Sequence, residues 1–331
     1  MKIVFNTTQP HAACSQMYMD AFRNLEGITF FDNNLEKYQV GLFMTYDHNL
    51  ISSVKSRYPN LKIGLIDPRS YRVMQDASLC DFLVVDSIEM EDFWRCSKKP
   101  IFRYAEYPEI PYIQKKHTKK DTVSIGYHGN RIHLECMSQN VTPALERLGL
   151  LYNLELVVTY NGPSPTGREK WYPKNVDVRH IKWNRDVYVN TLASCDIGIS
   201  PNNMIHDKNI KSLTSTQNKF NYSEDDYSLR FKMPSNPGRI IVFGKLGIPV
   251  VADFYPSAIQ YLQGDAGFVA HHTDGWFYSL EQLIKSHTLR SQMGTNLQNL
   301  VRNKFDYQVQ NTKFINFLEK ILTDNKESNT V

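Results

Sequence analysis

The sequence predicts an α/β protein built from two parallel-sheet domains in tandem, and three observations support that class. Short runs of β-branched and aromatic residues alternate with longer amphipathic stretches, which is the pattern of βαβ units. This alternation stops once, over residues 108–121, and then starts again. The length of 331 residues is too great for one ordinary core and suits two domains.

Six apolar runs in the first half predict strands, with helices between several of them. The strands are expected at 2–8, 28–33, 40–46, 62–67, 82–87 and 101–106, and the clearest helices at 12–26, 48–58 and 88–95. Pro108 and Pro111 then stand within four residues of each other. Proline fixes φ and has no N–H, so neither a helix nor a sheet ladder continues through this segment. We therefore expect an N-terminal domain over 1–110 and a linker over 111–121.

The same alternation resumes after the linker. Strands are expected at 122–129, 154–160, 176–183, 195–201, 248–254 and 267–270, and helices at 131–149, 184–194, 236–246 and through most of 255–322. Residues 204–230 are polar and long for a loop in a compact domain, which favours a functional or mobile segment. We expect a C-terminal domain over 122–305, then a helix and polar tail over 306–331, with the helix packing across the domain junction.

Composition excludes several classes of protein. No apolar stretch approaches the ~20 residues needed to span a bilayer, and the N-terminus lacks the apolar core of a signal peptide. The five cysteines stand singly, so neither a zinc site nor a disulfide framework is expected. A net charge of +4 is too small to argue for nucleic acid binding. We expect a cytoplasmic protein, and peripheral contact with a membrane stays open.

Polar residues that directly follow the strands are candidates for the site, because parallel sheets bind ligands at the carboxyl ends of their strands. In the first half these residues are His11, Asp47, His48, Asp67 and Glu106. In the second half they are His128, Gly129, Asn130, Arg131, Asn161, Asn184, Arg185, Asn202, Asn203 and Asp253. The first set is rich in acids and histidine, and the second is rich in amides and bases. This difference suits a cleft in which the first set transfers protons and the second binds an anion.

Three residues of the first half are candidate catalytic groups. His11 is the first candidate for a general base, because an imidazole titrates near neutral pH. A histidine that merely starts a helix is an equally good interpretation. Asp47 and Asp67 are rivals, since a carboxylate could accept the proton of a hydroxyl, and either could instead cap the segment that follows it.

The stretch over residues 230–253 carries the strongest signal for a ligand. Ser235 or Asn236 can cap the helix that begins there. Lys232 and Arg239 add positive charge to the N–H groups of the helix start, which suits a diphosphate leaving group. The alternative is a capped surface helix whose basic side chains lie in solvent.

A glycine turn at Gly126–Arg131 adds a weaker signal. It lacks the third glycine of a dinucleotide fingerprint and is not a GxxxxGK[ST] loop, so nicotinamide and ATP-hydrolysis functions are disfavoured. Gly129 could let a phosphate approach the backbone closely, or could serve the turn alone.

These motifs resemble the C-terminal donor-binding domain of GT-B glycosyltransferases similar to family four. The resemblance rests on Lys232, Ser235–Asn236 and Arg239, followed by the turn and strand over 244–252, and on the segments 125–130, 195–203 and 264–269. It covers about 122–305, whereas the first 107 residues match only in their βα rhythm. It implies a GT-B fold, with two Rossmann-like doubly wound domains facing a central cleft.

The resemblance also implies an activity and the roles of single residues. The activity would be transfer of a sugar, of hexosyltransferase type, from a nucleotide-diphosphate sugar to a glycan, lipid-linked or other hydroxyl acceptor, in glycan or surface polysaccharide synthesis. The donor-binding residues carried over by position are Gly129, Asn130 and Arg131 beside the phosphates, Lys232 and Arg239 on the diphosphate, Ser235 and Asn236 on phosphate or sugar hydroxyls, and Asn202 near the nucleotide or sugar.

The sequence departs from the family in one respect. Many members carry two glutamates eight positions apart on the donor sugar and ribose, where this chain has Pro234 and Val242. This puts those contacts and a retaining stereochemistry in doubt. No Asp-x-Asp triplet occurs, so the metal-dependent GT-A class is disfavoured and we expect no metal or other cofactor.

Two alternative functions stay open. One is a GT-B-fold nucleotide-sugar 2-epimerase, which would act on the donor without an acceptor. The other is a non-catalytic protein of the same fold that binds carbohydrate or a partner. The sequence does not determine the donor sugar, the nucleotide base, the acceptor, the stereochemical outcome or the oligomeric state.

Overall fold

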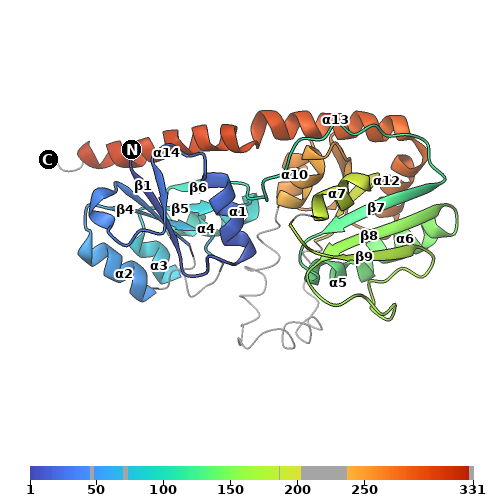
Figure 1. The fold of residues 1–331 in the computed structure, drawn as a ribbon, viewed down its shortest axis with the longest axis horizontal. Coiled ribbons are helices and arrows are strands. Elements are labelled where there is room, and N and C mark those ends of the chain that lie inside the picture. The colour runs from blue at the N-terminus through green and yellow to red at the C-terminus, as the bar shows by residue number, and fades with distance from the viewer. Residues whose placement is uncertain (45–47, 70–73, 186, 203–236, 328–331) are drawn as a thin grey trace. The chain divides into compact units, whose positions relative to one another are not determined.

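A computed structural model of the 331-residue chain describes all residues except 45–47, 70–73, 186, 203–236 and 328–331 (Figure 1). The described residues form two compact units. The first unit holds residues 1–109 together with the chain from Lys304 onward, and the second holds 110–202 and 237–303.

The first unit contains a parallel six-stranded sheet in the order β2-β1-β3-β4-β5-β6. Its strands are β1 (Ile3–Thr7), β2 (Ile28–Phe30), β3 (Val40–Met44), β4 (Lys62–Ile66), β5 (Phe82–Val85) and β6 (Ile101–Arg103). Its helices include α1 (Ala13–Phe22), α2 (His48–Arg57), α3 (Met74–Leu79) and α4 (Ile88–Trp94), with 3₁₀ turns η1 (Leu35–Lys37) and η3 (Arg95–Ser97). The central strands are apolar throughout because helices cover both faces of such sheets.

The last helix of the chain, α14 (Tyr307–Glu327), is part of the first unit's core (Figure 1). Phe314 stacks on Phe22 with ring centroids 5.6 Å apart, and Phe317 packs edge-on against Phe82 at 5.5 Å. The Tyr104 hydroxyl donates to Asn311 Oδ1 at 2.6 Å. The first unit is therefore assembled from the two ends of the sequence.

The second unit contains another parallel six-stranded sheet, in the order β12-β11-β10-β7-β8-β9. Its strands are β7 (Thr122–His128), β8 (Asn153–Tyr160), β9 (Asp177–Lys182), β10 (Ile197–Ser200), β11 (Val250–Asp253) and β12 (Gly267–Ala270). Its helices include α5 (Ile132–Glu135), α6 (Val141–Gly149), α7 (Tyr188–Ser194), α10 (Gly238–Lys245), α11 (Pro256–Tyr261), α12 (Thr273–Lys285) and α13 (His287–Lys304). The strand order reverses between β7 and β10, which is the topological switch point of this sheet.

The predicted α/β class with two parallel sheets is confirmed, and the main differences lie at element ends. The strand expected over 28–33 ends at Phe30, because Phe31 has φ of 61°, a left-handed conformation that no strand continues. The helix expected over 131–149 is interrupted by the 3₁₀ segment η4 (Cys136–Gln139) and by Asn140, whose φ of −129° is not helical. Among the described residues, no helix is long and apolar enough to cross a bilayer.

Candidate functional site

Two glycines lie in the strands on either side of the switch point of the second sheet. Gly126 in β7 and Gly198 in β10 lie under the Phe243 ring of α10, and a Cβ added at Gly198 would lie 2.5 Å from that ring. The missing side chains let α10 pack directly on these two strands. Arg239 lies four residues before Phe243, on the same face of α10, so its side chain reaches the carboxyl end of β7.

Gly129 makes room for Arg239 at this end of β7. Its φ is +128°, which L side chains rarely adopt, and its N–H donates to Thr159 O at 3.1 Å. A Cβ added there would lie 3.3 Å from Arg239 Cδ and 3.5 Å from Nη1. Both the turn and the close approach of the arginine therefore require glycine.

The Arg239 guanidinium is buried and only partly satisfied. The residue is 3% exposed, and its Nε and Nη2 atoms have no hydrogen-bond partner among the described residues. Burial and the nearby Arg239 charge lower the pKa of His128 to about 3, so that ring is neutral at physiological pH. Burial also raises the pKa of Tyr127, so its hydroxyl is neutral as well. A buried guanidinium with donors left over, and no acid paired with it in the described part of the chain, is the complement of an anion.

The residues that flank Gly129 and Asn202 are held by local bonds. Asn130 Oδ1 accepts from Ile132 N at 3.1 Å, and Arg131 Nε lies 3.4 Å from Glu135 Oε1. Asn202, which follows the adjacent strand β10, is buried, and its N–H donates to Asp253 Oδ2 at 2.5 Å. The other oxygen of that carboxylate accepts from Trp276 Nε1 at 3.0 Å, so Asp253 has a structural role.

The structure describes only part of the predicted site. Gly129, Asn130, Arg131 and Arg239 lie together at the end of β7, and Asn202 lies at the end of the neighbouring strand. His11 is exposed in the turn between β1 and α1. Of the other predicted residues, Asp67 lies in the first unit, whereas Asp47, Lys232, Ser235 and Asn236 lie outside the described residues.

A second polar centre lies in the first unit, at the carboxyl ends of β4, β5 and β6. Arg69 Nε donates to Asp67 Oδ1 at 2.5 Å, and Arg69 Nη2 donates to Asp86 Oδ2 at 3.1 Å and to Glu106 Oε1 at 3.0 Å. Asp67 has φ of 52°, and its N–H donates to Val84 O at 2.8 Å. Its carboxylate is thus committed to Arg69, where sequence reasoning offered a general base or a cap.

Asp67, Asp86 and Glu106 form a buried carboxylate cluster, and burial favours the neutral forms of Asp86 and Glu106. The three carboxylate side chains are 2%, 0% and 1% exposed, and one guanidinium faces them all. Burial, only partly offset by Arg69, raises the pKa of Asp86 to about 7 and the pKa of Glu106 well above its ordinary value. The second oxygens of Asp86 and Glu106 are buried without a partner among the described residues.

Sequence reasoning did not select Asp86 or Arg69 as site residues. Asp86 was assigned to the strand expected over 82–87. It is the first polar residue after four apolar ones, and this change from apolar to polar could have identified it as a strand-end residue. Arg69 stands three residues past the end of β4, and only the fold shows that it faces three strand ends. Within the part of the chain that is described, no group of three or more histidine, cysteine, aspartate or glutamate side chains is suited to a metal ion.

No protein-family model and no curated protein sequence matches the chain. Solved structures do match. A point mutant of Staphylococcus aureus TarM, in complex with fondaparinux, α-GlcNAc-glycerol and UDP, has a TM-score of 0.56 at 10% identity, over 86% of this chain and 55% of TarM. The pneumococcal O-GlcNAc transferase GtfA, in complex with UDP and GlcNAc, gives 0.53 at 10% identity, over 86% of this chain and 57% of GtfA.

WaaG, a glycosyltransferase involved in lipopolysaccharide biosynthesis, matches over nearly its full length. The TM-score is 0.55 at 12% identity, over 97% of this chain and 99% of WaaG. This chain spans little more than half the length of TarM and GtfA. Identities this low show a shared fold and nothing finer, so membership of family four stays a prediction. The chain has the α/β GT-B fold of these glycosyltransferases.

Proposed function

We propose that the chain is a glycosyltransferase that moves a sugar from a nucleotide-diphosphate sugar to an acceptor hydroxyl. The observation that carries this proposal is the buried Arg239 guanidinium, two of whose donors have no partner among the described residues, at the switch point of the second sheet. Leaving such donors unsatisfied is costly, so a site of this kind is built for an anion. A diphosphate is the anion that fits the fold.

The start of α10 supports the same ligand. The N-cap of α10 is Pro237, which makes no side-chain cap bond, and the amino end of α10 carries the positive end of the helix dipole beside Arg239. This dipole and the Arg239 guanidinium can together stabilise the negative charge that develops on a diphosphate leaving group as the glycosidic bond breaks. Gly129 contributes space, because its own N–H already bonds Thr159. TarM and GtfA were both crystallised with UDP, which favours a uridine donor among the nucleotides to test.

No metal is needed in this scheme. In metal-dependent transferases a cation neutralises the diphosphate, and here a guanidinium and a helix N-terminus would do so, with Lys232, Ser235 and Asn236 as further predicted contacts. Asn130, Arg131 and Asn202 would contact the phosphates, nucleotide or sugar.

For the acceptor, His11 is the better candidate base. It is exposed and follows β1, and β1 and β3 flank the switch point of the first sheet, whereas Asp67 is paired with Arg69. Asp47 remains a predicted rival. The acceptor would be a glycan or another hydroxyl compound, as in surface polysaccharide synthesis, a pathway class that the WaaG likeness favours.

The test is a thermal-shift screen with uridine, guanosine and cytidine diphosphates and their sugars, followed by a transfer assay. A bound donor stabilises the native state by mass action, so the correct nucleotide should raise the unfolding midpoint most. Incubation with the donor alone tests the two rival functions. Formation of an epimer would favour the epimerase, and binding with neither transfer nor hydrolysis would favour a binding protein. If no nucleotide shifts the midpoint, the proposal is wrong.

A further inference from the structure

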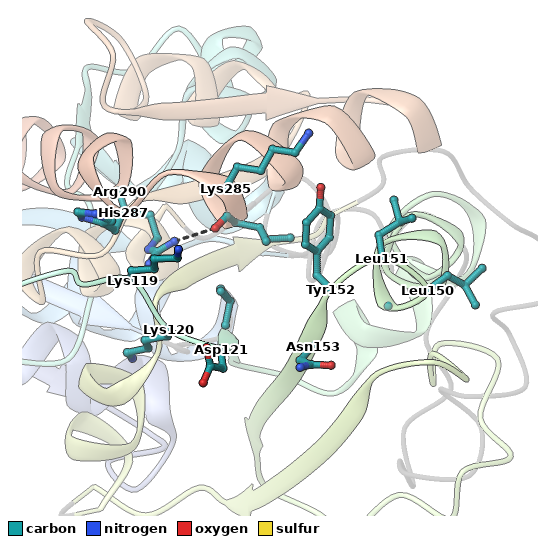
Figure 2. A pocket seen from close by; sticks show the side chains of 13 residues that line it. Lys119, Lys120, Asp121, Leu150, Leu151, Tyr152, Asn153, Lys285, His287 and Arg290 are labelled. Carbon is teal, nitrogen blue, oxygen red and sulfur yellow. Dashed lines mark hydrogen bonds between the residues drawn. The ribbon is translucent and has the colours of Figure 1, made fainter.

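A hollow of about 440 Å³, whose lining is drawn in Figure 2, lies on the second unit. Its walls come from the segment before β7, the turn between α6 and β8, and the junction of α12 and α13. These are the amino ends of β7 and β8, whereas ligands of parallel sheets bind at the carboxyl ends. The hollow is therefore separate from the site that holds Arg239. Its charged lining and histidine are Lys119, Lys120, Asp121, Lys285, His287 and Arg290.

Two of the cations in this lining are not fully engaged. Lys119 is exposed and has no hydrogen-bond or ion-pair partner among the described residues, unlike Lys120 and Lys285, which pair with Asp196 and Glu281. Arg290 is 1% exposed, and it donates to Leu283 O at 2.7 Å and to Thr118 O at 2.8 Å.

The Arg290 Nε atom is buried and has no partner in the described part of the chain. The N-terminus of α13, which begins at His287, adds the positive end of an 18-residue helix. Even when Asp196 and Glu281 are counted with Asp121, the four lysine and arginine side chains outnumber the acids. The hollow therefore favours an anion.

Two exposed leucines lie on its rim. Leu150 is 73% exposed and Leu151 is 61% exposed, both in the turn between α6 and β8. Figure 2 shows them apart from Lys119 and Arg290, on the other side of Tyr152. The Tyr152 hydroxyl donates to Glu281 Oε1 at 2.9 Å while its ring borders the hollow. A membrane-interface contact typically combines exposed apolar side chains, an aromatic ring whose hydroxyl is hydrogen-bonded, and basic side chains with unused N–H donors. This edge of the second unit has all three.

We propose that this edge of the second unit docks on an anionic phospholipid surface, with a lipid phosphate in the hollow and Leu150 and Leu151 in the acyl boundary. Lysine is depleted in the buried parts of protein–protein interfaces, whereas basic residues beside exposed apolar ones favour anionic lipid. The inference does not depend on the proposed transferase activity, because none of the residues involved belongs to the donor site.

The test is co-sedimentation of the full chain with vesicles of phosphatidylcholine, with or without phosphatidylglycerol. We expect binding to the anionic vesicles only, and weaker binding at high salt because charge attraction is screened. Lys119→Glu should weaken it at least about fivefold, the value of one basic residue near an anionic surface. Leu150→Ser combined with Leu151→Ser should weaken it at low and at high salt alike. These positions are exposed, so the variants should fold normally.

The control is Lys313→Glu, which makes the same charge change at an exposed position of α14 on the first unit. It should bind vesicles nearly as well as the wild type. The proposal is overturned by equal binding to neutral and anionic vesicles, or by loss of binding in Lys313→Glu but not in Lys119→Glu. Absence of vesicle binding would also overturn it and would leave the patch to a protein partner. Nucleotide binding, measured in parallel, reports on the donor site alone.

Discussion

Replacing Arg239 with methionine should separate the stability of the chain from its ligand binding. Methionine is unbranched and adaptable and carries no N–H donors, so it can fill much of the same space. In the unliganded chain, Nε and Nη2 of Arg239 are buried without a partner among the described residues. An unsatisfied buried polar group costs about 1–3 kcal/mol. The unliganded variant should therefore be more stable than the wild type, with a midpoint higher by about 2–4 °C per kcal/mol.

The same substitution should abolish tight binding of the nucleoside diphosphate. A hydrogen bond to a charged group contributes about 1.5–3 kcal/mol, so the loss of two such donors predicts about 3–6 kcal/mol, or at least about 100-fold in Kd. Calorimetric unfolding without ligand and isothermal titration with UDP would measure the two effects. Arg95→Met, at an exposed position of η3 in the first unit, should change neither. A variant that is less stable without ligand and binds UDP as tightly as the wild type would refute the reasoning.

Gly129→Ala should lower the free energy of unfolding by about 1 kcal/mol or more beyond the loss in Gly167→Ala, as measured by denaturant unfolding. Both glycines have positive φ, but only Gly129 has Arg239 within 4 Å of an added Cβ. Equal losses in the two variants would contradict this contact. Asp86→Asn should flatten the pH dependence of stability. Burial raises the pKa of Asp86 from 3.8 to about 7, so between these pH values the native chain holds a proton that the unfolded chain releases. The stability of the wild type should therefore fall as pH rises from about 4 to about 7. At about 1.4 kcal/mol per pKa unit this amounts to about 4 kcal/mol, and a wild-type stability that rises over that range would contradict it. Transfer activity should persist in excess EDTA, and complete loss that magnesium restores would show that a metal is required. His11→Ala should lower kcat by about 100-fold or more if the imidazole is the base, with an unchanged unfolding midpoint, whereas a small change in kcat would assign it to the helix start.

The sequence determined the features that depend on local pattern. Apolar runs of strand length, separated by amphipathic stretches, predicted two parallel sheets, because the period of side chains along a strand or helix is a property of neighbouring residues. Gly129 after a strand, and Arg239 near a helix start, could be selected as site residues for the same reason. The exact ends of elements were less accessible, since the left-handed Phe31 and the break at Asn140 depend on packing that no short window contains.

Only the tertiary structure decided which distant residues meet. Strand order brings the ends of β4, β5 and β6 together, so Arg69 faces Asp86 and Glu106, which lie 17 and 37 residues away. The burial that raises the pKa values of those carboxyls is likewise a property of the folded unit. The closing helix α14 joins the first unit through Phe314 and Phe22, far apart in sequence. Such contacts arise from long-range packing and from exclusion of water, which periodicity along the chain does not encode.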